Sequence, residues 1–129
     1  MILDNLGRIL LVKRGRPPKK GFWDIPGGFF EFNETAENGL VREIKEELGI
    51  EIKSWNYYCS QPDTYRYKGI IYETLSLFFL CRVSGKEDFR VGGDVKEIGW
   101  FFSRDIPYEK IAFASTAHVL KGFRDFGPN

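Results

Sequence analysis

The sequence has 129 residues, of which 43% are hydrophobic, and its 19 basic residues nearly balance 18 acidic ones. This length suits one domain, residues 1–129, built around one core. A net charge of +1 argues against a nucleic-acid partner, which would favour a basic surface. No apolar run approaches the ~18 residues that span a membrane, and the start carries no secretory signal. We therefore expect a cytoplasmic protein without a membrane or nucleic-acid partner.

The cysteines and the single histidine narrow the chemistry further. Cys59 and Cys81 stand far apart in apolar runs, which favours two reduced thiols over a disulfide or a metal site. His118 is the one histidine, so a His-based metal cluster is excluded and Ser-His-Asp chemistry is disfavoured.

The first 21 residues predict a hairpin followed by a loop. Residues 1–3 end a strand, residues 4–7 have turn chemistry, and the apolar run 8–13 forms the next strand. The first strand is expected to be short or truncated. The loop 14–21 contains two prolines and four of its residues are basic, which is typical of a solvated surface loop. The alternative is that Arg14 reaches a substrate phosphate, since its planar fork pairs with phosphate oxygens.

A glycine pair and a helix follow. Residues 22–26 are extended, Gly27 and Gly28 permit close backbone approach, residues 29–32 return to an extended pattern, and Asn33 can cap a helix.

The helix is expected over Thr35–Leu48, and Gly49 is its stop signal. Four residues, Leu40, Val41, Ile44 and Leu48, share its core face. Three carboxylates, those of Glu43, Glu46 and Glu47, lie at i, i+3 and i+4 on a neighbouring stripe. Two small residues, Ala36 and Gly39, fall on the same stripe and are expected to leave room for a bound group.

The remaining chain predicts strands, loops and a final helix. The segment 68–83 has the longest β pattern, with Ile71, Leu75, Leu77, Phe79, Cys81 and Val83 on one face. Its other face, with Tyr72, Thr74, Ser76 and Phe78, is suited to lining a cleft or packing under a helix. The other segments are a strand over 50–59, turns over 60–67, a loop over 84–95, a strand over 97–103 and a helix over 115–126.

The acidic stripe is better explained by a hard cation than by a solvated helix face. Like charges at i and i+4 destabilise a helix, and only Arg42 can reach back to Glu46. Oxygen ligands without histidine or thiolate indicate Mg²⁺ or Mn²⁺, which is usually shared with substrate phosphates.

At these residues the chain resembles the Nudix hydrolases. Their signature is a Gly, five residues, a Glu, seven residues, then Arg-Glu-apolar-x-Glu-Glu-x-Gly-apolar. This sequence matches it at every fixed position: Gly28, Glu34, Arg42, Glu43, Ile44, Glu46, Glu47, Gly49 and Ile50. Segments 10–14, 23–28 and 97–101 also look like family segments.

The resemblance implies an α+β fold, an α/β/α sandwich around a mixed sheet with the signature as a loop-helix-loop. It implies hydrolysis, with Mg²⁺ or Mn²⁺, of a nucleoside diphosphate linked to another group, as in ADP-ribose or a dinucleotide. Carried over by position, the metal residues are Gly28 through its carbonyl, Glu43, Glu46 and Glu47, with Glu34 supporting the metal cluster. Arg42 would orient the carboxylates through a salt bridge. The general base would be Glu43 or Glu46, or a later acid, Asp94 or Glu97.

The residues outside the signature point to more than one substrate class. The start of the NADH pyrophosphatase signature is present at residues 60–62, but residues 63–66 depart from it. Tyr65, Tyr67 and Tyr72 are candidates to stack on a base, and Arg14 to bind phosphate. The alternatives are a MutT-like nucleoside triphosphate pyrophosphohydrolase and a catalytically silent module that senses a nucleotide. If the first strand is truncated, a wall of the substrate site is either missing or supplied by a partner chain in a homodimer.

Overall fold

The computed structural model describes residues 1–126, in which six strands form one mixed sheet. The strands are β1 (Ile2–Leu3), β2 (Ile9–Arg14), β3 (Trp23–Asp24), β4 (Trp55–Tyr67), β5 (Ile70–Arg82) and β6 (Val95–Phe101). The helices are α1 (Ala36–Leu48) and α2 (Ala114–Phe126), with short 3₁₀ turns at Ser103–Asp105 and Tyr108–Lys110. None of the helices described is long and apolar enough to cross a membrane.

The sheet runs in the order β3-β2-β1-β5-β4, and β6 pairs with the other edge of β2. β1 pairs antiparallel with β2, which confirms the predicted hairpin, and parallel with β5. β2 is therefore the central strand and carries β1 and β3 along one edge. Its residues alternate between two cores, as a strand buried on both faces requires.

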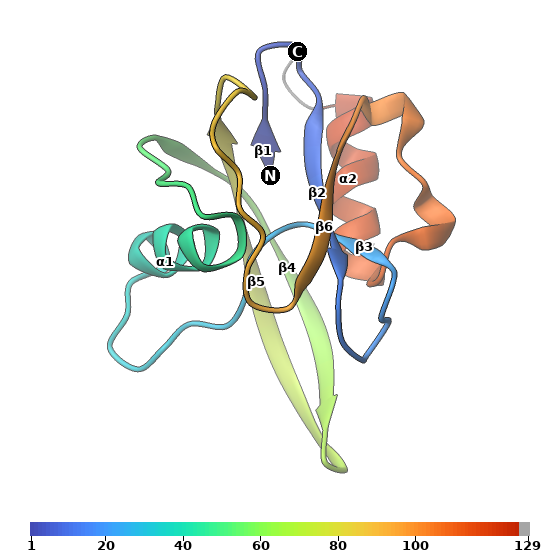
Figure 1. Ribbon diagram of the computed structural model, residues 1–129. Helices are drawn as coiled ribbons and strands as arrows, with labels where there is room; N and C mark the ends of the chain where they lie inside the picture. The colour runs from blue at the N-terminus through green and yellow to red at the C-terminus, as the bar shows by residue number, and fades with distance from the viewer. Residues whose placement is uncertain (127–129) are drawn as a thin grey trace.

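The two helices cover opposite faces of this sheet (Figure 1). Leu10 and Val12 pack with Ile44 and Leu48 of α1. On the other face of β2, Ile9 and Leu11 pack with a cluster that contains Val119, Leu120 and Phe123 of α2. The α/β/α sandwich is thus confirmed. Val41 was expected on the core face of α1, but it belongs to neither of the clusters found in residues 1–126.

β4 and β5 form a long hairpin that extends beyond the helices (Figure 1). The prediction of turns over 60–67 was wrong, because those residues continue β4 and pair with β5 as far as Tyr67 opposite Ile70. Pro62 lies in the edge strand β4, which is where sheets accommodate proline. The expected strand over 50–59 begins only at Trp55, although Ile50 and Ile52 are buried under α1.

The predicted alternation along β5 is confirmed. Leu77, Phe79 and Cys81 pack in the cluster that contains α1, whereas Phe78 packs in the cluster that contains α2. The last strand lies at Val95–Phe101, two residues earlier than expected at each end.

Candidate active site

Helix α1 is held at both ends by local signals in its sequence. The Thr35 hydroxyl oxygen accepts a hydrogen bond from the Asn38 N–H at 3.1 Å, so Thr35 and not Asn33 is the N-cap. Asn33 instead lies in the left-handed region with φ 60°. Gly49 takes φ 70° and its N–H donates to the Lys45 carbonyl at 3.0 Å. These caps set the ends of the helix, and the packing of Ile44 and Leu48 against the core sets which face it buries.

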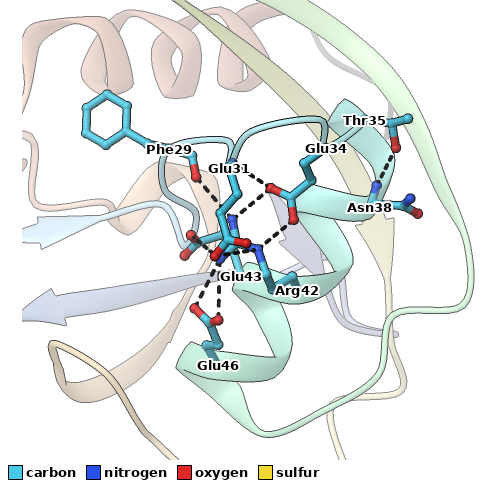
Figure 2. A network of polar contacts seen from close by, with 8 residues as sticks. All are labelled: Phe29, Glu31, Glu34, Thr35, Asn38, Arg42, Glu43 and Glu46. Carbon is cyan, nitrogen blue, oxygen red and sulfur yellow. Dashed lines mark hydrogen bonds and ion pairs between the residues drawn. The ribbon is translucent and has the colours of Figure 1, made fainter.

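Arg42 is the centre of a polar network on that face (Figure 2). Its guanidinium donates to both oxygens of Glu34, from Nε at 2.6 Å and from Nη2 at 2.9 Å. Its Nη1 donates to Glu43 at 2.9 Å and to Glu46 at 3.2 Å. Its Nη2 also reaches the Phe29 carbonyl at 3.1 Å. The expected salt bridge to Glu46 is present, and the same guanidinium also forms ion pairs with Glu31, Glu34 and Glu43.

Both carboxylate oxygens of Glu34 accept hydrogen bonds. Besides the bonds from Arg42, it accepts the Glu31 N–H at 2.9 Å. The Arg42 hydrogen bonds, with that backbone bond, lower the pKa of Glu34 to about 2. Glu34 therefore ties the loop before α1 to the helix.

The backbone of the glycine pair lies against the carboxylates of Glu43 and Glu47. The Gly27 N–H donates to Glu47 Oε1 at 2.7 Å. A Cβ added at Gly28 would stand 2.6 Å from the carboxyl carbon of Glu43, which is closer than real Cβ atoms come. The missing side chain at residue 28 therefore leaves the space that the Glu43 carboxylate occupies.

Burial leaves three of the acids beside this loop with raised pKa values. Burial raises the pKa of Glu47 to about 8, and the Gly27 N–H offsets this only in part. Burial also raises the pKa of Asp24 to about 6, against hydrogen bonds from the Thr116 hydroxyl at 3.0 Å and the Ile25 N–H at 2.8 Å. The pKa of Glu43 is raised by the same cause. A cation bound among these acids would favour their carboxylate forms and oppose the effect of burial on their pKa values.

The chemistry of the residues around the glycine pair suits a hard divalent cation. The donors are carboxylate oxygens and the backbone of a bare glycine, which are the ligands that Mg²⁺ and Mn²⁺ prefer. Within residues 1–126, no three acidic side chains form a ready metal-binding group. Arg42 holds Glu43 and Glu46 here as ion-pair partners, so a cation would have to compete with Arg42 for them.

The expected role of the small residues on α1 was wrong. A Cβ added at Gly39 would stand 2.9 Å from the Phe30 ring and 3.0 Å from Glu34 Oε1, and Ala36 packs against the core. The loop before α1 therefore fills the space beside Gly39, and the core fills the space beside Ala36, so neither position is open to a diphosphate.

Asp94 and Glu97 stand apart from the helix network. Glu97 pairs with Lys13 across the β2–β6 ladder at 2.5 Å, and Asp94 pairs with Arg16 at 3.0 Å. Among the described residues, no hydrogen bond or ion pair connects either acid to the carboxylates of α1. The structure therefore does not bring these two candidates into contact with the acidic stripe.

Arg14 is held at the end of β2 next to an acid that the sequence reasoning missed. Its Nε donates to the Pro18 carbonyl at 2.7 Å, its Nη1 lies 3.8 Å from Asp24 Oδ2, and its guanidinium stacks 5.0 Å from the centre of the Phe113 ring. The positive charge of Arg14 opposes, to a small extent, the burial that raises the pKa of Glu47. The signal that was available for Asp24 is its position between Trp23 and Ile25, where burial of a lone acid is costly.

The three predicted tyrosines come together on the β4–β5 hairpin. They line an open groove of about 460 Å³ with Phe29 and two polar residues. The lining is Phe29, Tyr65, Tyr67, Tyr72, Glu73 and Thr74. Phe29 was missed because a single aromatic residue in an irregular loop carries no periodic signal.

Known proteins resemble this chain over most of its length. The NUDIX domain profile matches residues 1–121. An ADP-ribose pyrophosphatase from Methanocaldococcus jannaschii is 40% identical over 114 residues, which are 87% of this chain and 63% of that protein. The 8-oxo-dGTP diphosphatase of Proteus vulgaris is 56% identical over 67 residues, 50% of this chain and 54% of that protein. The chain therefore spans less than two thirds of the length of these two relatives.

A solved structure agrees with the sequence match. The crystal structure of a MutT NUDIX hydrolase from Burkholderia pseudomallei superposes with a TM-score of 0.77 and 30% identity, covering 92% of this chain and 90% of the other. The fold, the spacing from Gly28 to Ile50 and the profile match agree, and the chain belongs to the Nudix family.

Proposed function

We propose that the protein hydrolyses the diphosphate linkage of a nucleoside diphosphate joined to another moiety, such as ADP-ribose or a dinucleotide, with Mg²⁺ or Mn²⁺. The observation that carries the proposal is the arrangement around Arg42, which gathers Glu34, Glu43 and Glu46 beside the glycine pair. The relative that is 40% identical and is named an ADP-ribose pyrophosphatase supports this substrate class.

In this proposal the acids of α1 divide into two roles. Glu43, Glu46 and Glu47 hold the cation together with the Gly28 carbonyl. Glu34 acts through Arg42, since both of its oxygens are occupied by that side chain, and it supports the cluster without binding the cation itself. The bound cation would neutralise phosphate charge and make a water molecule more acidic.

The base that takes a proton from the attacking water is Glu43 or Glu46. Both lie on the helix face beside the glycine loop. Asp94 and Glu97 are the alternatives, and each would have to leave its basic partner, Arg16 or Lys13. Arg14 is proposed to bind a phosphate from the end of β2, where Asp24 and the Pro18 carbonyl orient its guanidinium.

A second candidate is a MutT-like nucleoside triphosphate pyrophosphohydrolase. The 8-oxo-dGTP diphosphatase with 56% identity over 67 residues favours it. A silent nucleotide-sensing module is the alternative from another class, and the complete set of three carboxylates on α1 argues against it. In each case we propose that residues 1–129 act as one domain on a small nucleotide, and sedimentation would distinguish a monomer from a homodimer.

One assay separates these functions. The protein is incubated with Mg²⁺ and ADP-ribose, NADH, dinucleoside polyphosphates or nucleoside triphosphates, and the products are resolved by chromatography. The proposal predicts AMP plus a sugar phosphate or a second mononucleotide. A nucleoside monophosphate plus pyrophosphate would support the MutT-like alternative, and no turnover of any compound would defeat both enzyme functions.

A further inference from the structure

The loop between β5 and β6 crosses the last turn of α1 and caps it. The Arg90 N–H donates to the Leu48 carbonyl at 2.9 Å, and the Gly92 N–H donates to the Glu47 carbonyl at 3.1 Å. The last carbonyls of a helix have no partner within the helix, so this loop supplies the donors for two of them. The loop passes beside α1 before it enters β6 (Figure 1).

Gly92 brings the main chain of this loop against the main chain of a residue that carries a carboxylate. A Cβ added at Gly92 would stand 2.5 Å from the carbonyl oxygen of Glu46, which is closer than real Cβ atoms come. The obstructing atom belongs to the backbone of a helix, so it cannot turn aside as the end of a side chain can. A side chain at residue 92 would therefore move either the loop or the end of α1.

Just after Gly92, the same chain reaches the end of β2. The Gly15 N–H donates to the Asp94 carbonyl at 2.7 Å, and a Cβ added at Gly15 would stand 2.8 Å from that carbonyl oxygen. Val95 then lies opposite Arg14 in the β2–β6 ladder. The backbone around Arg14 is therefore held by the chain that also caps α1.

This short segment thus joins the two parts of the proposed site. Glu46 and Glu47 are the proposed cation ligands at this end of α1, and Arg14 is the proposed phosphate-binding residue. Among residues 1–126, no hydrogen bond or ion pair joins the Arg14 side chain to either glutamate; its own polar partners are the Pro18 carbonyl and Asp24. The separation of the two parts is therefore set through the backbone.

The core gives a second connection between β2 and α1, but it is less directional. Val12 packs in one cluster with Ile44 and Leu48, and apolar contacts of this kind fix the spacing of layers without fixing a direction. Hydrogen bonds do have a preferred direction. Phe89 anchors the segment that makes them, since its ring belongs to the same cluster and lies edge-on to Trp100 at 5.8 Å.

We propose that residues 89–95 form a strap that positions the cation-binding carboxylates of α1 relative to Arg14. Gly92 and Gly15 are positioning residues in this strap, because each leaves room for a carbonyl oxygen that a side chain would displace. The inference rests on the proposed function and adds the element that sets the distance between the two parts of its site.

Two backbone N–H groups report the two ends of the strap without cation or substrate. The Gly27 N–H donates to Glu47 Oε1 at 2.7 Å and reports the carboxylate end. The Gly15 N–H, which donates to the Asp94 carbonyl, reports the Arg14 end. The test measures hydrogen exchange of these groups by NMR, each in the variant that alters the opposite end: Gly15 in Gly92→Ala, and Gly27 in Gly15→Ala.

Two other glycines provide the controls. Gly85→Ala lies in the same loop outside the strap, where the new Cβ would stand 3.0 Å from Asp4 Cβ and φ is 91°, so it should lower Tm without moving the site. Gly93→Asn lies within the strap, has φ 56° and no atom within 4 Å of an added Cβ. Asparagine tolerates this left-handed conformation, so the strap should keep its contacts.

We expect each strap variant to lose about tenfold in exchange protection at the opposite end, and both controls to exchange there like the wild type. With the best diphosphate substrate, we expect Gly15→Ala to raise the Mg²⁺ concentration for half-maximal rate by about tenfold, although residue 15 is not a proposed ligand. We expect Gly92→Ala to raise KM to a similar extent.

Exchange effects at the opposite ends without turnover of any diphosphate by the wild type would support the strap and defeat the proposed hydrolysis. Turnover by the wild type with unchanged exchange at the opposite ends would overturn the strap and leave the hydrolysis standing. The same exchange effects in Gly85→Ala would also overturn the strap, because they would show general loosening of the fold. If Gly92→Ala does not fold, exchange at Gly27 in Gly15→Ala decides.

Discussion

Arg42 holds Glu34 through two parallel hydrogen bonds, from Nε to Oε2 at 2.6 Å and from Nη2 to Oε1 at 2.9 Å. The two residues are eight positions apart, so the pair fastens the loop that follows the glycine pair onto α1. The remaining nitrogen of the fork is then directed at Glu43 and Glu46. The position of the catalytic carboxylates in our account depends on this pair.

Arg42→Lys tests that dependence. A lysine keeps the charge but cannot form two parallel bonds to one carboxylate while it contacts two others. We expect a lower Tm and a loss in kcat/KM of about tenfold or more. Arg90→Lys is the control, since Arg90 pairs with Asp88 at an exposed site. Wild-type Tm and kcat/KM in the Arg42 variant would contradict the assigned role.

Gly28→Ala tests the close approach of the loop to the helix. The new Cβ would meet the Glu43 carboxyl at 2.6 Å, and the end of that side chain would turn away from it. We expect a folded protein with a strongly reduced kcat. Gly122→Ala, in α2 with no atom near the new Cβ, should keep the activity and gain ~0.5–1 kcal/mol of stability. A Gly28→Ala enzyme with wild-type kcat would show that Glu43 need not lie against residue 28.

Mg²⁺ should stabilise the folded protein. A cation that binds only the native state adds stability by mass action, by ~2.7 kcal/mol when its free concentration is 100 times Kd. We expect Tm to rise with Mg²⁺, and the rise to be smaller in Glu47→Gln. The control is Glu37→Gln, which removes an exposed acid from the first turn of the same helix. If Mg²⁺ raised Tm equally in the two variants, Glu47 would not be a ligand of the cation.

The metal-free protein should lose stability as pH rises through the titration of Glu47. Burial raises the pKa of Glu47 from 4.5 to about 8 on folding, so the native state binds this proton more tightly than the unfolded state. Its contribution is complete below pH 4.5 and falls as pH increases toward 8, by an amount on the order of a few kcal/mol. Asp24 acts with the same sign at lower pH, because its pKa rises from 3.8 to about 6.

Denaturant unfolding of the wild type and of Glu47→Gln from pH 5 to 9 measures this effect. The pKa of the buried amino terminus is lowered to about 6. Its contribution to the pH dependence of stability is the same in both proteins, so it cancels in the difference between them. We expect the wild type to lose stability relative to the variant between pH 6 and 8, and saturating Mg²⁺ to reverse the trend. A difference that does not depend on pH would show that Glu47 is solvated.

The signature spacing predicts the helix and the acidic stripe because both depend on local periodicity. Ile44 and Leu48 are buried where the 3.6-residue period places them, and the i, i+4 pair of Arg42 and Glu46 forms as expected. Glu34 could not be assigned as the main partner of Arg42 in this way, because the path of an irregular loop has no period.

The errors arise from contacts that the local periodicity of the sequence does not encode. Residues 60–67 read as turns because of their polar composition and Pro62, but pairing with β5 makes them a strand. Gly39 was interpreted as space for a ligand, and the loop residues Phe30 and Glu34 occupy that space. The contact of Phe29 with Tyr65 joins segments 36 residues apart and depends on how the glycine loop crosses the sheet.

The central claim is that the protein hydrolyses a diphosphate with a divalent cation held by the carboxylates of α1. Its most direct test is ³¹P NMR of the fastest diphosphate substrate with the wild type, with wild type plus a chelator, and with Glu46→Gln. The account predicts that the wild type converts the diphosphate signals into phosphate monoester signals. It also predicts that the chelator stops the reaction and that Glu46→Gln slows it by about 100-fold or more. Turnover that survives both the chelator and Glu46→Gln would contradict the account.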